Sequence, residues 1–199
     1  MKAIKQIYSL EEYIELEKST DEKFEFWKGD VWSMSGASSA HNRIVRNLIT
    51  ELDLQLRERG CEVFPSDMRI KVPSYQPYRY PDLTALCGKA EIENFRGQEL
   101  LVNPQLIVEV LSKSTEAFDR GDKFSYYKSI ESFTEYILVA QHRPHVSQFI
   151  KHGDGFWMNL EFNDLSDVFK LGSVPCELNL AAIYRGVSFE TNESESETA

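Results

Sequence analysis

Two apolar segments separated by a helical segment constrain the fold of this chain more than any other feature. Residues 106–111, LIVEVL, and 135–140, EYILVA, are almost wholly apolar, which is typical of strands buried on both faces of a sheet. Between them, residues 114–130 place aromatic and aliphatic side chains at helical spacing. A strand–helix–strand unit of this kind joins parallel strands through a right-handed crossover. We therefore expect one mixed α/β sheet with helices on its faces.

The rest of the chain adds helices, strands and two hairpins to this unit, in the core order αβββαβ. Capping residues and amphipathic spacing predict the helices, and alternating or apolar runs between turn residues predict the strands. The expected helices are 9–19, 38–60 and 177–186, the expected strands 61–72, 78–88, 104–112 and 168–174, and the expected hairpins 23–35 and 145–162.

Length and charge restrict the class of protein. The chain of 199 residues is long enough for one domain with a full core, which we assign to residues 1–188, followed by an acidic and disordered tail at 189–199. A net charge of −10 argues against a surface that grips nucleic acid everywhere. The sequence has no apolar run of membrane-spanning length and no signal-peptide core after Met1, so we expect a cytoplasmic protein that does not enter membranes.

The three cysteines predict neither a zinc site nor a disulfide framework. Cys61, Cys87 and Cys176 lie far apart and form no CxxC pair. We expect them to be free thiols in a reducing compartment.

Glu109 is an exception within the apolar strand. An unpaired, ionised glutamate buried there costs on the order of 3 to 5 kcal/mol. Asp82 follows Pro81 at the start of the preceding strand, so two carboxylates meet at one sheet edge if the strands are neighbours. A divalent cation between them would compensate both charges, and Mg²⁺ prefers one or two carboxylates. The alternative is that Glu109 pairs with an arginine or a lysine, or caps a helix.

Lys123 is the nearest candidate for a cationic group. It lies four residues after Asp119 in the expected helix, so the two side chains share a face. Alone, such a pair is typical of a solvent-exposed helix surface. This helix, however, begins just after the Glu109 strand, at the sheet end where α/β proteins place ligands.

The segments YRYPDLTALCG, PQLIVEVLSKSTEAFDRGDKFSYYKSI and TEYILVA together resemble the Uma-two family of endonucleases. The segment FEFWKGDVWSMSGASSAHNRIV is similar to the family's opening, and the resemblance covers roughly residues 10 to 185. That family belongs to the PD-(D/E)XK restriction-endonuclease-like superfamily, so the resemblance implies a restriction-endonuclease-like sheet core flanked by helices.

By position, Asp82 matches the PD element and Glu109 the (D/E) element. The superfamily's lysine would stand at position 111, which is Leu111 here. The resemblance therefore implies Lys123 as its replacement, with Lys71 as the second choice. It also implies that Asp82 and Glu109 hold Mg²⁺ or Mn²⁺.

Four further residues are accessory candidates through the same match. Asp119 would orient Lys123, and His41, at the start of the long helix, would contact phosphate or act as a neutral imidazole. Glu25 lies in the first hairpin and Asp67 at the start of the first of the three strands. The tryptophans are expected in the core or on sheet faces rather than as platforms for stacking bases: Trp27, Trp32 and Trp157.

The function expected from these features is metal-dependent hydrolysis of phosphodiester bonds, with DNA as substrate and a homodimer as the assembly. Leu111 at the usual lysine position, and Ala140 and Gln141 where the family often has an aspartate, favour an alternative. In that alternative, the fold is a catalytically weak or inactive module that binds nucleic acid or protein. A homodimeric protein-interaction domain is the third hypothesis.

Overall fold

The computed structural model of this protein describes residues 7–20, 22–34 and 36–189. The expected acidic tail at 189–199 therefore lies outside the described residues except for its first residue. The helical segments are α1 (Leu10–Ser19), α2 (Ser39–Leu56), α3 (Glu116–Phe118), η1 (Asp119–Lys123), α4 (Phe124–Tyr127) and α5 (Leu180–Ile183). None of these helices is both long and apolar enough to cross a membrane.

A six-stranded mixed sheet forms the centre of the molecule, in the order β12-β11-β10-β9-β6-β3. Its strands are β3 (Cys61–Pro65), β6 (Leu83–Cys87), β9 (Leu106–Leu111), β10 (Glu135–Ala140), β11 (Val146–Lys151) and β12 (Trp157–Phe162). The two most apolar strands, β9 and β10, are parallel neighbours in the middle, as the sequence predicts. All other neighbours are antiparallel, and the second expected hairpin is β11–β12.

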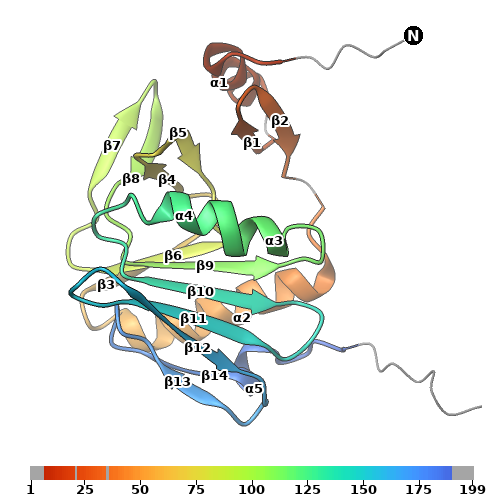
Figure 1. Ribbon diagram of the computed structural model, residues 1–199, viewed down its shortest axis with the longest axis vertical. Helices are drawn as coiled ribbons and strands as arrows, with labels where there is room; N and C mark the ends of the chain where they lie inside the picture. The colour runs from red at the N-terminus through yellow and green to blue at the C-terminus, as the bar shows by residue number, and fades with distance from the viewer. Residues whose placement is uncertain (1–6, 21, 35, 190–199) are drawn as a thin grey trace, which may run out of the picture.

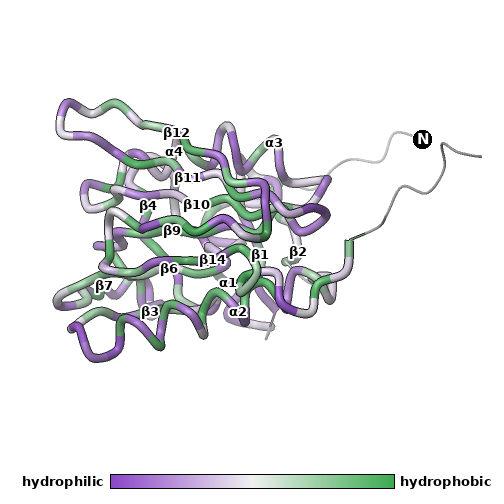
Figure 2. The backbone as a smooth tube through the Cα atoms, turned by 90° about the horizontal axis from the view of Figure 1, so that it is seen from below, coloured by the Kyte–Doolittle hydropathy of each residue, from purple (hydrophilic) through white to green (hydrophobic). Residues whose placement is uncertain are grey.

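Helices cover both faces of this sheet, which explains why β9 and β10 are buried along their whole length (Figure 1). Alternate residues Val108 and Val110 pack with α2, whose apolar stripe includes Leu48 and Leu52. The other face, which includes Ile107, packs against the segment α3–η1–α4. The tube of β9 and β10 is accordingly mostly hydrophobic at the centre of the molecule (Figure 2). The mixed α/β fold expected from the sequence is confirmed.

The crossover between β9 and β10 contains a π-helical turn. Its backbone runs from α3 through η1 into α4 without a break. A π-turn inserts one extra residue into a helix and is frequent at functional sites. Here both Asp119 and Lys123 in the π-turn are buried.

A second, four-stranded sheet was not expected. It has the order β5-β4-β8-β7 and consists of β4 (Arg69–Val72), β5 (Tyr75–Arg79), β7 (Ile92–Phe95) and β8 (Gln98–Leu101). The single strand predicted at 61–72 is wrong: Pro65 ends β3, and a turn closed by the Met68 N–H to the Pro65 carbonyl (3.0 Å) leads into β4. The alternation of apolar and polar residues continues across this turn, so the sequence pattern did not reveal it. The β7–β8 hairpin turns at Arg96 and Gly97, with φ of 52° and 88°.

The N-terminal elements pack as a layer beside this second sheet. The predicted hairpin is β1 (Phe24–Trp27) and β2 (Asp30–Ser33), turning at Lys28 and Gly29 with φ of 48° and 90°. One of its faces packs with α1, with Tyr78 of β5 and with Tyr80 just after it in a third core cluster. Glu17 of α1 is buried there and accepts hydrogen bonds from the hydroxyls of Tyr78 and Tyr80.

The C-terminal elements support the far end of the main sheet. The predicted strand at 168–174 is β13 (Val168–Lys170), which pairs with β14 (Glu177–Asn179), and α5 follows directly. Glu135, wholly buried in β10, accepts hydrogen bonds from the N–H groups of Gly172 and Ser173. That carboxylate holds the β13–β14 connection against the sheet.

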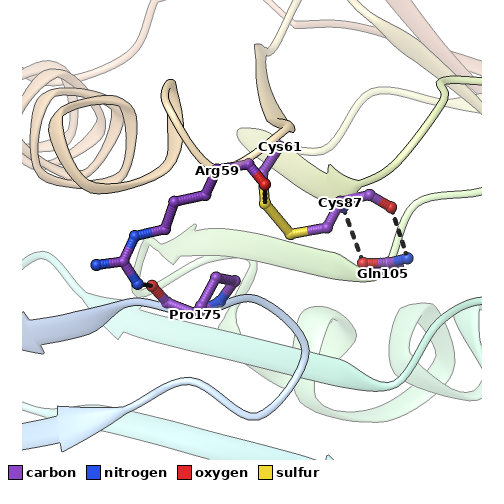
Figure 3. The surroundings of a disulfide bond; sticks show 5 residues. All are labelled: Arg59, Cys61, Cys87, Gln105 and Pro175. Atoms are coloured by element: carbon purple, nitrogen blue, oxygen red, sulfur yellow. Dashed lines mark hydrogen bonds between the residues drawn. A yellow bond between two sulfur atoms is a disulfide. The ribbon is translucent and has the colours of Figure 1, made fainter.

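A disulfide joins Cys61 and Cys87, so the expectation of free thiols is wrong for this pair (Figure 3). The residues stand opposite each other in the antiparallel pair β3–β6, with Cα atoms 3.9 Å apart. Gln105 fixes this end of β6 through both backbone groups of Cys87. The two cysteines are 26 residues apart in the sequence, and this spacing alone does not predict that they pair across two strands. Cys176 is free and buried, as expected.

Candidate active site

A cavity of about 940 Å³ lies where β1, β2, the start of α2, the end of β9 and the π-turn meet. Of the residues predicted for the site, it brings together the three catalytic candidates and three of the four accessory ones: Asp82, Glu109, Lys123, Glu25, His41 and Asp119. Asp67 and the second-choice lysine, Lys71, are not among its lining residues.

Asp82 is held at the mouth of the sheet by two hydrogen bonds. One carboxylate oxygen, Oδ2, accepts the N–H of Val110 at 2.6 Å, and Oδ1 lies 3.0 Å from Nε2 of His41. The strand register pairs Leu83 with Val108, so Asp82 stands opposite Glu109. Opposed residues of antiparallel strands point to the same face, so the two carboxylates face one cavity.

Glu109 is buried, with 5 % of its side chain exposed. Its Oε1 accepts the hydroxyl of Tyr127 at 2.8 Å and lies 2.8 Å from Nζ of Lys123. Burial disfavours the carboxylate and raises the pKa of Glu109 to about 8, against the opposing effect of Lys123; Asp82 and Asp119 raise it further. The strand thus contains a paired glutamate that binds a proton readily.

Lys123 reaches this carboxylate from the π-turn, not from the strand. Its Nζ lies 3.2 Å from Asp119 and 4.0 Å from Glu25, besides its contact with Glu109. Burial opposes the charge on Lys123, but these three carboxylates outweigh burial and raise its pKa well above the ordinary value. Lys123 is therefore an ammonium ion at any physiological pH.

The accessory candidates divide into those at the cavity and one outside it. Glu25 bridges Lys123 and the buried Arg79, whose Nη1 lies 2.9 Å from its Oε2. His41 stands in the first turn of α2, next to the Ser38 cap, and contacts Asp82. Asp67 lies in the turn after β3 and pairs with Lys23 at the surface.

Lys71 pairs with Glu93 on the second sheet, so it offers no alternative to Lys123.

The sequence analysis missed two residues of this site, Arg79 and Tyr127. Arg79 is 1 % exposed and stacks on Tyr75, with 3.8 Å between guanidinium carbon and ring centre. Tyr127 contributes only to the helical spacing of residues 114–130 in the sequence, yet its hydroxyl donates to Glu109. The motif YRYPD contains Arg79 two residues before Pro81, a spacing that places it near Asp82.

The charges of the cavity favour a cation ligand. Only two side chains that line the cavity carry a fixed positive charge, Arg79 and Lys123. Five lining side chains have carboxyl groups: Glu25, Asp82, Glu109, Asp119 and Asp122. Without further positive charge, such a cavity repels a phosphate group. Asp82 and Glu109 offer the hard oxygen donors that Mg²⁺ and Mn²⁺ take, and carboxylate oxygens in hydrogen bonds keep free lone pairs. The described residues contain no cluster of three or more His, Cys, Asp or Glu side chains for a metal, so these two would hold it with water.

Comparison with known proteins agrees with this geometry. Residues 10–182 match the model of the Uma2 family, described as "Putative restriction endonuclease". The chain belongs to the Uma2 family. Its nuclease-like character follows from that membership, and the resemblance expected from the sequence is confirmed.

Two relatives from Synechocystis sp. match most of this chain. The chain is 36% identical over 159 residues to sll1609 and 34% identical over 181 residues to slr1290, both described as uncharacterized proteins of Synechocystis sp.. These matches cover 80% and 91% of this chain, and 89% and 93% of the relatives.

A solved structure shares the fold. It is a crystal structure from Anabaena variabilis, described as a "putative nuclease belonging to DUF820", with a TM-score of 0.70 and 13% identity. The match covers 89% of this chain and 97% of that one. Most of the fold of this Uma2 protein therefore belongs to a shared architecture.

Proposed function

We propose that this protein is a divalent-cation-dependent endonuclease that hydrolyses phosphodiester bonds in DNA. One observation carries the proposal: Asp82, Glu109 and Lys123 come from three different elements and line one cavity, with Lys123 2.8 Å from Glu109. The fold and the family support a nuclease-like function, and these three side chains suggest the mechanism by which it would work.

Asp82 and Glu109 would hold Mg²⁺ or Mn²⁺. Such an ion polarises a phosphoryl oxygen and lowers the pKa of coordinated water. The Val110 N–H fixes the Asp82 carboxylate against the strand, so its position does not depend on a flexible rotamer. Glu109 is positioned likewise by the Tyr127 hydroxyl.

Lys123 would act as a fixed positive charge rather than as a base. Its raised pKa keeps it protonated, and only a neutral amine accepts a proton. An ammonium ion here donates hydrogen bonds and offsets the negative charge that develops on the phosphorane. Asp119 and Glu25 hold the ammonium in place.

The alternative of an inactive binding module rested on the missing lysine at position 111, on Gln141 where the family often has an aspartate, and on the net charge of −10. Lys123 supplies an ammonium to Glu109 from the π-turn, which removes the first reason. Gln141 lines the cavity and receives the hydroxyl of Ser38, so a polar group does stand at the end of β10. These contacts favour the active nuclease.

The test is cleavage of supercoiled plasmid and linear duplex by purified protein, with Mg²⁺, Mn²⁺ or EDTA. We expect nicking that depends on the metal and that is abolished in Asp82→Ala and Glu109→Gln. Lys123→Met should reduce the rate by about 100- to 1000-fold, as loss of one transition-state donor does. Lys123→Arg keeps the charge and should retain part of the activity.

A matched control keeps the result specific to the cavity. Asp67→Asn removes a carboxylate that lies outside the cavity, so its nicking rate should equal that of the wild type. Circular dichroism of each variant excludes unfolding as the cause of a loss. Equal residual cutting by all variants would show a contaminating nuclease and defeat the proposal.

A further inference from the structure

The β1–β2 hairpin turns one face to its core and the other to the cavity. Phe26 and Val31, opposed in register, belong to the core face and pack with α1. Glu25 and Trp32 are also opposed in register, so they share the other face. Glu25 lies 4.0 Å from Lys123, and Trp32 lines the same cavity as this proposed catalytic group.

Trp32 differs from the other two tryptophans in its surroundings. Trp27 stacks on Tyr75 with ring centres 4.6 Å apart, and Trp157 packs on Phe124 at 5.0 Å. Trp32 is 47% exposed, and within the described residues no aromatic ring stacks on it. All three tryptophans lie in the core or on a sheet face, as expected, but Trp32 presents an open indole at the cavity wall.

The cavity has room for more than the group that would react. Its volume of about 940 Å³ is several times that of a phosphodiester group. Trp32 and the 38% exposed Met34 line it together with the carboxylates of Asp82 and Glu109. Exposed apolar side chains and carboxylates that could bind a cation, lining one cavity, fit a nucleotide, whose flat base and charged phosphate need both.

We propose that Trp32 is a stacking platform for an unpaired nucleobase next to a phosphate that would bind through the cation held by Asp82 and Glu109. This inference rests on the function proposed above and names its substrate class: single strands, or duplexes with an unpaired nucleotide at the cut. A base within an intact duplex has both faces covered by its neighbours, so it cannot stack on an indole. An unpaired base can, whatever its identity.

Binding can be measured apart from cleavage. Fluorescence anisotropy with Ca²⁺, an ion that binds oxygen ligands, would compare three labelled DNAs of one sequence: a single strand, a perfect duplex, and a duplex with one central unpaired nucleotide. A gel run afterwards verifies that the DNA is intact. We expect the wild type to prefer the first and third over the perfect duplex.

Substitution of Trp32 should remove that preference. Trp32→Ala should weaken binding of the single strand and the unpaired-nucleotide duplex by roughly 5- to 100-fold, the usual effect of losing one base–aromatic stack, without changing the perfect duplex. Trp32→Phe keeps a ring and should retain most of the affinity. Phe156→Ala removes an aromatic of similar exposure, 55% against 47%, at the β11–β12 turn and should change nothing.

The outcomes separate this inference from the nuclease proposal. An equal change for all three DNAs in Trp32→Ala, or no change for any, overturns the stacking platform even if the protein cuts DNA. Trp32→Leu gives an apolar side chain without a π face, and wild-type affinity in that variant would likewise overturn it. Selective binding through Trp32 without cleavage of any substrate would support the platform and defeat the nuclease.

Discussion

The buried glutamate shows how one residue can satisfy two hypotheses that first seemed to exclude each other. Glu109 does pair with a lysine, Lys123, as a structural ion pair would. It also lines the cavity opposite Asp82, as a cation ligand would. Buried ion pairs stabilise folds weakly because desolvation offsets their attraction. The arrangement at Glu109 is therefore better explained by what it can bind than by stability.

The raised pKa of Glu109 predicts a pH-dependent stability in the absence of metal. The folded pKa of about 8 lies above the value of 4.5 for an unperturbed glutamate. Between these values the folded state keeps a proton that the unfolded state releases, so the free energy of unfolding falls as pH rises, by up to about 1.4 kcal/mol per pH unit. Glu109→Gln cannot titrate and keeps the acceptor for Tyr127, so its stability should fall less steeply.

Urea unfolding of both proteins in EDTA at several pH values between 5 and 8 checks this expectation. The difference in unfolding free energy should shift in favour of Glu109→Gln as pH rises, because most other titrating groups are common to both proteins. Parallel curves would show that Glu109 is ionised throughout this range. Glu93→Gln serves as a surface control and should follow the wild type.

Strand order was sufficient to predict that Asp82 and Glu109 lie close together. Asp82 precedes one apolar run and Glu109 lies within the next, and the register of the two strands places them opposite each other. Asp67 stands in a turn that apolar alternation concealed, so its distance from the cavity was not predictable. Arg79 was missed because its strand belongs to a second sheet without a clear pattern of its own.

At the scale of the element, the π-turn decides which lysine serves the site. A lysine two residues after Glu109 would be delivered by the strand itself, but that position is Leu111, which packs in the core beneath the crossover. The π-turn instead buries both Asp119 and Lys123 against β9. Helical spacing predicted their shared face, whereas the extra residue of the turn has no signature in the sequence.

The pairing of β3 with β6 predicts the number of reactive cysteines. Protein purified without reductant and alkylated in denaturant should react at one thiol, Cys176, and at three after reduction. In the native state Cys176 should also resist alkylation, because burial raises its pKa to about 11. At pH 8 only on the order of one molecule in a thousand then carries the thiolate. Mass spectrometry of the alkylated peptides identifies each site.

A variant without Cys176 tests whether the number of reactive thiols reports on the Cys61–Cys87 disulfide. Cys176→Ser should give no reactive thiol before reduction and two after it. Three thiols in the unreduced wild type would mean that Cys61 and Cys87 remain apart, as cysteine spacing alone had predicted.

At the scale of the whole molecule, the negative charge of the protein opposes binding of the expected substrate, DNA. The net charge is −10, and the cavity itself carries more carboxylates than cations. Binding of a polyanion at such a cavity needs added positive charge at the point of contact. The homodimer, the cytoplasmic location and the cation expected from the sequence remain predictions, and the described charges support the last of them.

A cation bound at Asp82 and Glu109 should therefore stabilise the whole fold. A ligand that binds only the folded state at 100 times its dissociation constant contributes about 2.7 kcal/mol. For a chain of this size, that corresponds to a rise in thermal midpoint of roughly 5 to 10 °C. Scanning calorimetry with Mn²⁺ against EDTA at constant ionic strength measures the rise, and Asp82→Asn should abolish most of it.

The same measurement distinguishes a site from general screening of the acidic surface. Asp67→Asn lowers the negative charge by the same amount as Asp82→Asn but lies outside the cavity, so it should keep the full rise. If both variants lose the rise equally, or if added NaCl reproduces it, the ion acts on net charge and no cation site exists at Asp82 and Glu109. If only Asp82→Asn loses it, the ion binds where two strands bring their carboxylates together, and the acidity of the cavity becomes a requirement of binding instead of an obstacle to it.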